Sequence, residues 1–268
     1  MGAKWIFRKV KILLSIAFLL SITLISLFPH SLAPYEPQQM FSEILAKPSF
    51  THVCGTDGLG RDIFSLMVYS TRMTFFAGIA IAAVSGTIGI AVGCLAGING
   101  GFIDNIIVEG INLFSIIPSV FIVLLVATTG EITFFQYVLV ASVSFWTGTA
   151  RIMRSQMLTT MELPFVQTLL YLGERKIIVI VKHIIPNAIA PVITNIALTV
   201  ASACVLECGL SYIGVCGLEY SLGLIMNHGQ RYILSAWWIT GYPIIVILLI
   251  CVSILGIVDM VKDSQELS

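Results

Sequence analysis

Residues 74–97 read TFFAGIAIAAVSGTIGIAVGCLAG, a stretch without a single charged side chain. A helix needs about 20 mostly apolar residues to cross a bilayer, so this stretch predicts a membrane-spanning helix. Gly86, Gly89, Gly93 and Gly97 recur at intervals of three and four residues and therefore share one helix face. Small residues on one face let a second helix approach closely, and we expect tight helix packing there.

Five further apolar stretches have a similar length. They cover residues 10–30, 105–128, 133–150, 187–207 and 237–258. The whole chain is 57% hydrophobic and only 10% charged, whereas a soluble protein carries about 25% charged residues. The stretches are continuously apolar, without the alternation of a membrane β-barrel. We therefore predict an all-α, polytopic membrane protein with six transmembrane helices.

The distribution of basic residues predicts the orientation, because lysine and arginine concentrate in cytoplasmic loops. With the N-terminus inside, ten of the 14 basic residues are cytoplasmic: Lys4, Arg8, Lys9, Lys11, Arg151, Arg154, Arg175, Lys176, Lys182 and Lys262. Four lie outside: Lys47, Arg61, Arg72 and Arg231. Both termini are thus expected in the cytoplasm. The net charge of zero gives no indication of nucleic-acid binding.

The N-terminal apolar run has an alternative interpretation. Basic residues precede Ile12–Phe28, and Ser31-Leu32-Ala33 resembles a signal-peptidase site. The run is long for a signal peptide, and Pro34 would follow the cut, so we interpret it as a retained transmembrane helix. The expected organisation is an N-terminal unit, residues 1–73, with one helix and an external segment. A core, residues 74–268, then holds five helices and a cytoplasmic loop at 151–186.

Two sequence motifs outside the first span carry a family resemblance. The first is His52-Val-Cys-Gly-Thr-Asp-Gly-Leu-Gly-Arg-Asp-Ile-Phe-Ser65, and the second is Glu207-Cys-Gly-Leu-Ser-Tyr-Ile-Gly214. Both resemble segments of permease subunits of binding-protein-dependent ABC importers, in the dipeptide, oligopeptide and nickel branch. The resemblance covers nearly the whole chain from about residue 54 onward.

A third motif lies in the cytoplasmic loop, where this branch couples to its ATPase. The matching residues are Ala150-Arg-Ile-Met-Arg154, Phe165–Gly173 and His183-Ile-Ile-Pro-Asn187, which includes Pro186. The Glu-Ala-Ala triplet of the family is replaced by Gln167-Thr168-Leu169.

The loop residues themselves predict a short helix over about 162–172 that is ended by Gly173. Phe165, Leu169 and Leu172 are spaced at i, i+4 and i+7 and would form one apolar stripe. Such a helix docks in a partner's groove or rests on the membrane surface, and the resemblance favours docking.

The other two motifs each leave two interpretations. Gly55, Thr56, Asp57, Gly60, Arg61 and Asp62 are typical of turn structure, with Arg61 and Asp62 expected to pair; alternatively they form a gate or a landing surface for a binding protein. In the helix motif of Glu207, Leu210, Ser211 and Gly214, we interpret Glu207 as a polar anchor between helices rather than a substrate contact.

Three residues within the spans have their own expectations. Glu109, near the inner end of the third span, is expected to reach interfacial water rather than to form a functional site. Pro118 is expected to kink that span. Cys204 and Cys208 lie one helical turn apart near Glu207, but two thiols do not make a metal site, and we expect no bound metal.

The resemblance implies a transport subunit rather than an enzyme. No Gly-x-x-x-x-Gly-Lys-Ser/Thr loop occurs, so ATP and Mg²⁺ are expected on partner subunits and this chain is expected to bind no cofactor. The implied partners are a second homologous permease, two ATPase subunits, an extracytoplasmic binding protein and membrane lipid. Peptides are the favoured substrate and nickel the alternative. An intramembrane serine protease with Ser211 is a remote alternative, because the four histidines lie at span ends or in polar loops rather than in a span interior.

Overall fold

The computed structural model describes residues 2–128, 130, 132–215 and 218–266, with side chains described from residue 10 to residue 262. The elements of this part are all helical: α1 (Gly2–Leu27), α2 (Pro29–Leu32), α3 (Ile63–Asn99), α4 (Gly101–Ile116), α5 (Ser119–Ala127), α6 (Phe134–Met161), α7 (Pro164–Tyr171), α8 (Lys176–Val179), the π-helical turn η1 (Ile180–Ile184), α9 (Ile185–Ile213), α10 (Leu222–Gly229), the 3₁₀ turn η2 (Gln230–Tyr232) and α11 (Trp238–Glu266). The predicted all-α class is confirmed.

Four segments of the described chain are long and apolar enough to span a membrane: Val10–Leu27, Ile63–Asn99, Lys176–Ile213 and Trp238–Lys262. The bent pair α4 and α5 makes a fifth if it is one span. The sixth predicted span, 133–150, lies in α6, which has 28 residues but carries more polar side chains and is not among these candidates. Its place beside α3 in the bundle comes from packing rather than from hydropathy.

Helices continue past the apolar stretches into the polar segments expected at 31–73 and 151–186. Helix α3 begins at Ile63, so it runs through residue 73, the expected boundary of the N-terminal unit. Helix α6 continues to Met161, and α8 begins at Lys176. Within the expected segment 151–186, residues 162–175 connect α6 to α8 and contain α7. Backbone hydrogen bonds of a helix need no apolar side chains, so a helix does not have to end where an apolar stretch ends.

Helix α3 packs tightly against α6 through its glycines. A Cβ atom on Gly89 would lie 2.5 Å from Cβ of Thr149, and one on Gly93 would lie 2.6 Å from the carbonyl oxygen of Ala150. Gly97 makes the equivalent approach to Met157. The predicted close contact is confirmed for these three residues. Gly86 differs, because it approaches Ile196 of α9.

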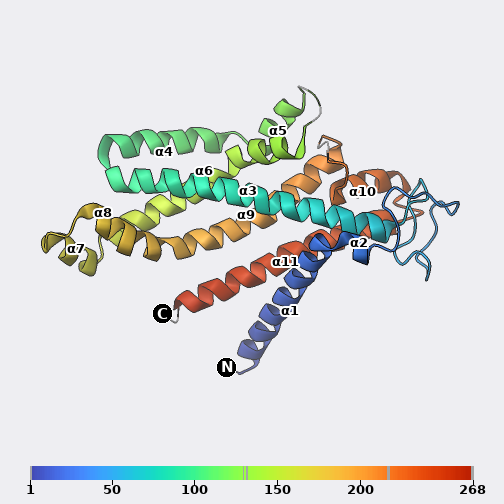
Figure 1. Cartoon of the computed structure of the whole chain (residues 1–268), viewed down its shortest axis with the longest axis horizontal. Helices are drawn as coiled ribbons and strands as arrows, with labels where there is room; N and C mark the ends of the chain where they lie inside the picture. The colour runs from blue at the N-terminus through green and yellow to red at the C-terminus, as the bar shows by residue number, and fades with distance from the viewer. Residues whose placement is uncertain (1, 129, 131, 216–217, 267–268) are drawn as a thin grey trace.

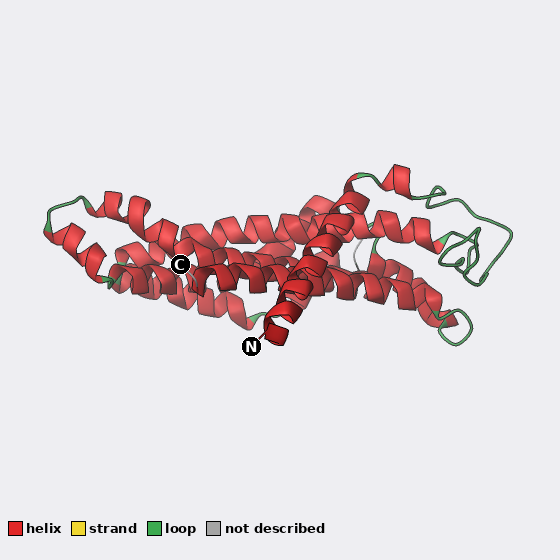
Figure 2. Ribbon diagram, turned by 90° about the horizontal axis from the view of Figure 1, so that it is seen from below, coloured by secondary structure: helices red, strands yellow, loops and turns green. Residues whose placement is uncertain are grey.

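The bundle has two dissimilar ends, which Figure 1 shows at the left and right. Helices α7 and α8 lie at one end, and both chain termini point toward that end. The loop of residues 33–62 lies at the other end with α10. Figure 2, turned by 90°, shows the same concentration of loops at the ends of the long helices.

The third predicted span is broken. Helix α4 ends at Ile116 and α5 begins at Ser119, with a bend of 69° between them. Pro118 lies in the break as the N-cap of α5, as its missing N–H and fixed φ would favour. The kink predicted at this proline is confirmed.

Candidate functional site

Helix α7 is a short helix of eight residues at one end of the bundle (Figure 1). It begins with Pro164 in its first turn and is anchored by Val166, which is fully buried. Val166 packs in a cluster with Met153 and Met157 of α6 and with Ile180 and Ile184 of the η1 turn. Val166 was not among the predicted site residues, because a valine in an apolar loop gives no specific signal.

Gly173 ends this helical segment in a left-handed conformation with φ of +86°. The N–H of Gly173 donates to the carbonyl of Leu170 at 3.1 Å, and the N–H of Glu174 donates to the carbonyl of Leu169 at 3.2 Å. Glycine adopts this conformation without a Cβ penalty. The structure thus places the end of the predicted coupling helix at the predicted residue.

The predicted apolar stripe does not form a single free face. Leu169 packs against the buried cluster, whereas Phe165 and Leu172 are exposed, with Leu172 at 77%. The helix is attached through Val166 and Leu169, and this turns the remaining residues outward. Tyr171 joins the free surface at 87% exposed.

Gln167 and Thr168 also lie on this outer side, and their polar groups are used locally. Gln167 Nε2 donates to the carbonyl of Met161 at 2.8 Å, and Thr168 Oγ1 donates to the carbonyl of Pro164 at 2.8 Å. Pro186 lies in the first turn of α9 rather than beside α7. The preceding π-helical turn, Ile180–Ile184, accommodates a residue that cannot donate a backbone hydrogen bond.

The motif of residues 52–65 lies largely within a folded segment, residues 33–62, which we call the cap, rather than in a free loop (Figure 1). The Asp57 carboxylate accepts from the backbone N–H groups of Leu59 and Arg61, at 2.8 and 2.9 Å. The Arg61 guanidinium reaches the same carboxylate at 2.6 and 2.7 Å. Arg61 therefore pairs with Asp57, and the expected pair with Asp62 is wrong.

Asp62 has a different task at the start of α3. Its Oδ2 accepts from the N–H and the hydroxyl of Ser65, both at 2.8 Å, which makes it the N-cap of the helix. Its Oδ1 lies 2.9 Å from Nδ1 of His52, and both side chains are buried. Burial and, less strongly, the adjacent negative charge of Asp62 raise the pKa of Cys54 to about 11.

The remaining cap residues are also structural. Gly55 and Gly60 have positive φ values of 78° and 74°, and a side chain on Gly55 would collide with the Ala46 carbonyl at 2.5 Å. Thr56 Oγ1 donates to the Glu43 carbonyl at 2.6 Å and accepts from the N–H of Ala46 at 2.8 Å. These contacts favour the turn interpretation of the motif.

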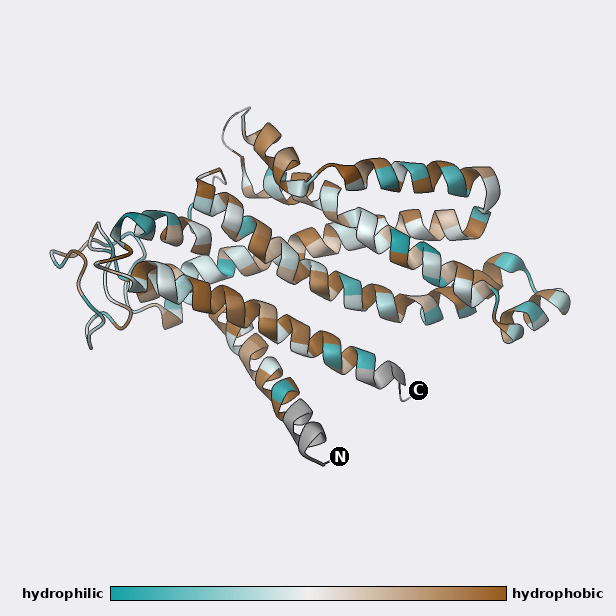
Figure 3. Cartoon of the chain, turned by 180° about the vertical axis from the view of Figure 1, so that it is seen from behind, coloured by the Kyte–Doolittle hydropathy of each residue, from teal (hydrophilic) through white to brown (hydrophobic). Residues whose placement is uncertain are grey.

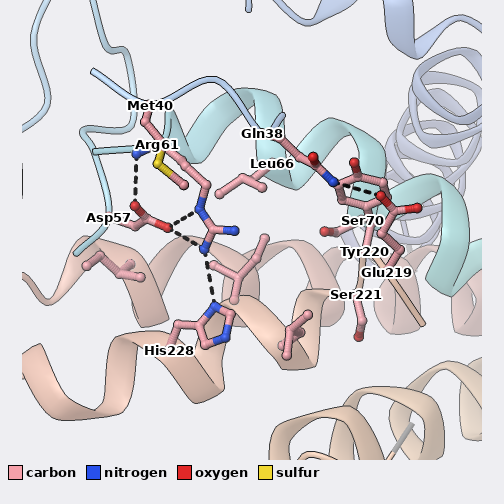
Figure 4. Close-up of a pocket in the computed structure, with 13 residues that line it drawn as sticks. Gln38, Met40, Asp57, Arg61, Leu66, Ser70, Glu219, Tyr220, Ser221 and His228 are labelled. Carbon is pink, nitrogen blue, oxygen red and sulfur yellow. Dashed lines mark hydrogen bonds and ion pairs between the residues drawn. The ribbon is translucent and has the colours of Figure 1, made fainter. Parts of the chain in front are cut away.

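The cap and α10 enclose a cavity of about 190 Å³, drawn in Figure 4. Arg61 Nη2 bridges from Asp57 toward Nδ1 of His228 on α10, at 3.3 Å. Partial burial and the positive charge of Arg61 lower the pKa of His228. On the opposite wall, Gln38 donates to Glu219 at 2.8 Å. The cavity is polar on both walls, but its charges are largely engaged with one another.

Glu207 is fully buried between α9 and α3. Its carboxylate accepts from the hydroxyls of Thr74 at 2.6 Å and Ser211 at 2.7 Å. This geometry fits an anchor between helices, and the engaged carboxylate is not free for substrate. Leu210 is buried beside it, and Gly214 ends α9 with φ of +84°.

The described residues contain no group of three or more His, Cys, Asp or Glu side chains that could hold a metal ion. Cys204 and Cys208 are buried thiols that donate to the Thr74 carbonyl and to Glu207. Cys216 lies outside the described residues.

One ion pair could not be predicted from the sequence. Arg154 of α6 binds Asp104 of α4 through two hydrogen bonds, at 2.5 and 2.6 Å. Such a forked pair fixes both distance and orientation between the helices. Arg154 belongs to the Ala150–Arg154 motif, but nothing in the sequence identifies an aspartate 50 residues earlier as its partner.

Comparison with known proteins identifies the class that this arrangement represents. Residues 89–263 match the family described as binding-protein-dependent transport system inner membrane component. A dipeptide transport system permease of Bacillus subtilis is 32% identical over 221 residues, which cover 81% of this chain and 68% of that protein. An oligopeptide transport system permease of Mycobacterium tuberculosis H37Rv is 26% identical and covers 94% and 89%.

The fold has a solved counterpart. A chain of the MetNI methionine ABC transporter, in an inward-facing conformation, superimposes with a TM-score of 0.57 at 17% identity, covering 73% of this chain and 96% of that one. The chain belongs to the family of inner membrane components of binding-protein-dependent transport systems. It is therefore a permease subunit of an importer, in a family of transport components rather than of catalytic enzymes.

Proposed function

We propose that this chain forms half of the translocation path of an ATP-driven importer for dipeptides or oligopeptides. The relatives compared above are named as dipeptide and oligopeptide permeases, which supports peptides over nickel. A second homologous permease supplies the other half of the path. An extracytoplasmic binding protein delivers the substrate to the capped end of the bundle.

The coupling site of this machine is α7, and the observation that carries this assignment is its exposed apolar surface. Phe165, Tyr171 and Leu172 project from the end of the bundle, while Val166 and Leu169 hold the helix to the core. A partner's groove covers such side chains in the helix-in-groove mode. Two separate ATPase subunits bind and hydrolyse ATP with Mg²⁺, and their approach moves α7 and the helices attached to it.

The α7 end is cytoplasmic in this proposal. Arg175 directly precedes α8, Lys176 begins α8, and Lys182 lies in the adjoining η1 turn. Helices α7 and α8 lie at that end (Figure 1), and the positive-inside rule favours the cytoplasm for such basic residues. Both termini point the same way, so they are cytoplasmic too. The cap of residues 33–62 then faces the outside of the cytoplasmic membrane.

The proposal is tested by reconstitution of the complete complex in proteoliposomes. The permease pair, the ATPase subunits and the binding protein are assayed for uptake of a radiolabelled dipeptide and of ⁶³Ni²⁺, each with and without ATP. We expect uptake of the dipeptide that requires both ATP and the binding protein, and none by this chain alone. Uptake of nickel but not of any peptide would overturn the substrate, and ATP-independent uptake by the single chain would overturn the mechanism.

A further inference from the structure

The break in the third span leaves backbone groups without helical partners. Ile117 is extended, with φ of −85° and ψ of 115°, and Pro118 has no N–H to offer the carbonyl of Phe114 four residues earlier. In the described part of the chain, no hydrogen bond is found to the carbonyl oxygens of Ser115 and Ile116. The C-terminal end of α4 therefore presents free acceptors, and the Arg151 guanidinium lies beside them, because its Nη2 donates to the Ser115 hydroxyl at 3.3 Å.

These acceptors lie where lipid cannot satisfy them. The break falls in the middle of the predicted span 105–128, and Ser115 to Pro118 are all exposed on the surface of this chain. Lipid tails offer no hydrogen bonds, so an irregular backbone at this depth must be covered by protein or must line a water-filled cavity. Discontinuous helices at the midplane mark substrate sites in other transporters.

The flanks of α4 show which side of the break meets water. One row of side chains along α4 leads to the break at Ile116. It carries the exposed polar residues Asn105, Glu109 and Asn112. Phe102, Ile106 and Leu113 are exposed on the adjacent flank, and a third face packs against α6 through Asp104. Teal patches recur along α4 in Figure 3 between brown ones. One flank thus suits water and the other suits lipid.

A groove continues from the break across the neighbouring helices. It has a volume of about 440 Å³ and starts at Ser119, the first residue of α5. Phe145 of α6 and Ser202 and Gly209 of α9 line it further along. The Ser202 hydroxyl donates to the Leu198 carbonyl at 3.1 Å, which leaves its oxygen free to accept. The rest of its wall is formed by Val120, Val205, Leu206, Leu210 and Ile213, so the groove is mostly apolar, with Ser119 and Ser202 as its hydroxyl groups.

We propose that the broken segment 115–119 lines the translocation path and that its carbonyls accept hydrogen bonds from the backbone N–H groups of a passing peptide. This inference rests on the proposed function, because it takes a peptide as the substrate. Nearly every residue of a peptide carries an N–H whatever its side chain. Backbone carbonyls in the path therefore recognise peptides independently of their sequence.

The test measures water access at the break in the assembled complex. Ser119→Cys and Ile116→Cys are compared with Leu125→Cys, whose position on α5 is 71% exposed in this chain but lies away from the groove. A charged, membrane-impermeant methanethiosulfonate reacts with a thiolate, which requires water at the thiol. The wild-type complex gives the background from the native cysteines.

We expect the Ser119→Cys and Ile116→Cys variants to react faster than Leu125→Cys, by about tenfold or more, and a transported dipeptide to slow this reaction. Equal, background-level reaction at all three positions would show that protein or lipid covers the break, and the inference would be wrong. Fast reaction without protection, in a complex that does transport the dipeptide, would refute the carbonyl contact. Absence of dipeptide uptake by the wild-type complex would instead refute the proposed function, since labelling needs no transport.

Discussion

At the scale of single residues, the contact between α3 and α6 depends on glycines that have no room for a side chain. A Cβ atom at position 93 would lie 2.6 Å from the Ala150 carbonyl oxygen and 2.7 Å from the Met153 Cβ, both on α6. A methyl group at Gly110 of α4 would have nothing within 4 Å of it. Comparing alanine at Gly93 with alanine at Gly110 therefore separates the cost of overpacking from the intrinsic helix preference of alanine.

We expect Gly93→Ala to destabilise the protein by about 1–3 kcal/mol, as overpacking does, and Gly110→Ala to be neutral or slightly stabilising. Thermal unfolding of the detergent-solubilised complex measures both. Equal melting temperatures for the two variants would mean that α3 and α6 are farther apart than in this structure.

The pKa of His228 predicts a pH dependence of the external cap. Its pKa lies below the ordinary value of about 6.5, through partial burial and the Arg61 charge. The folded protein then binds fewer protons than the unfolded chain, so this histidine contributes stability above about pH 6.5 that is lost as the pH falls below it. Of the other charged groups that act on His228, Asp57 raises its pKa and Arg231 lowers it.

We expect the melting temperature to fall on acidification from pH 7 to pH 5, and to fall less in His228→Gln, which keeps a neutral polar side chain. Parallel pH profiles for the wild type and this variant would contradict the role of His228. Other carboxylates and histidines affect both proteins equally, so the difference between the profiles isolates this residue.

The residues also show what a sequence pattern can and cannot predict. Positive φ at Gly173 follows from glycine at the end of an apolar helical stretch, and the structure has it. Asp62 directly follows Arg61 in the sequence, and this adjacency favoured Asp62 as the ion-pair partner, which is wrong. The turn at Gly58 and Gly60 instead brings the Asp57 carboxylate to the Arg61 guanidinium. Neighbouring positions in the sequence do not predict turn geometry of this kind.

At the scale of elements, the coupling assignment depends on which face of α7 is free. A charge at Leu169 would disturb the chain's own core, because this side chain packs inward. Leu172 is the better probe, since it is exposed and an added charge there meets only a partner. Leu234 is a matched leucine at the opposite end and is 100% exposed.

We expect Leu172→Asp to abolish ATPase co-purification and peptide uptake while the chain still reaches the membrane, because an unpaired charge is costly in an apolar groove. Leu234→Asp should leave ATPase association intact. Normal association and uptake in Leu172→Asp would mean that α7 is not the coupling element.

Substitutions at Gly173 test whether the left-handed turn that ends the α7 segment is needed for coupling. We expect Gly173→Val to weaken ATPase association and Gly173→Asn to retain most of it, because asparagine tolerates the left-handed conformation and valine does not. Co-purification of the ATPase with each variant measures this. Indistinguishable behaviour of Val and Asn at this position would contradict a role for the φ of +86°.

Element boundaries were the least predictable part of the fold. The apolar stretch 74–97 identifies α3, but the helix starts at Ile63, where Asp62 and Ser65 form its N-cap. The break at Pro118 was predicted as a kink, yet its 69° size depends on Ile117 leaving the helix as well. The ion pair between Asp104 and Arg154 joins helices that no local pattern connects.

At the scale of the whole molecule, the bundle has two ends that we assign to different functions. Exposed apolar side chains of α7 mark one end, and a hydrogen-bonded cap marks the other. The termini point toward the α7 end, so a single assignment of sides fixes the orientation of every element. That assignment rests on the basic residues alone and is directly measurable.

The decisive measurement is sided cysteine labelling in intact cells, in a background without the native cysteines. Phe50 of the cap is fully exposed and serves as the external reporter, and Tyr171 of α7 is the internal one. With an impermeant maleimide added outside, we expect Phe50→Cys to be labelled in intact cells and Tyr171→Cys only after the membrane is permeabilised. Labelling of Tyr171→Cys from outside, with Phe50→Cys protected, would reverse the orientation and contradict a cytoplasmic coupling helix.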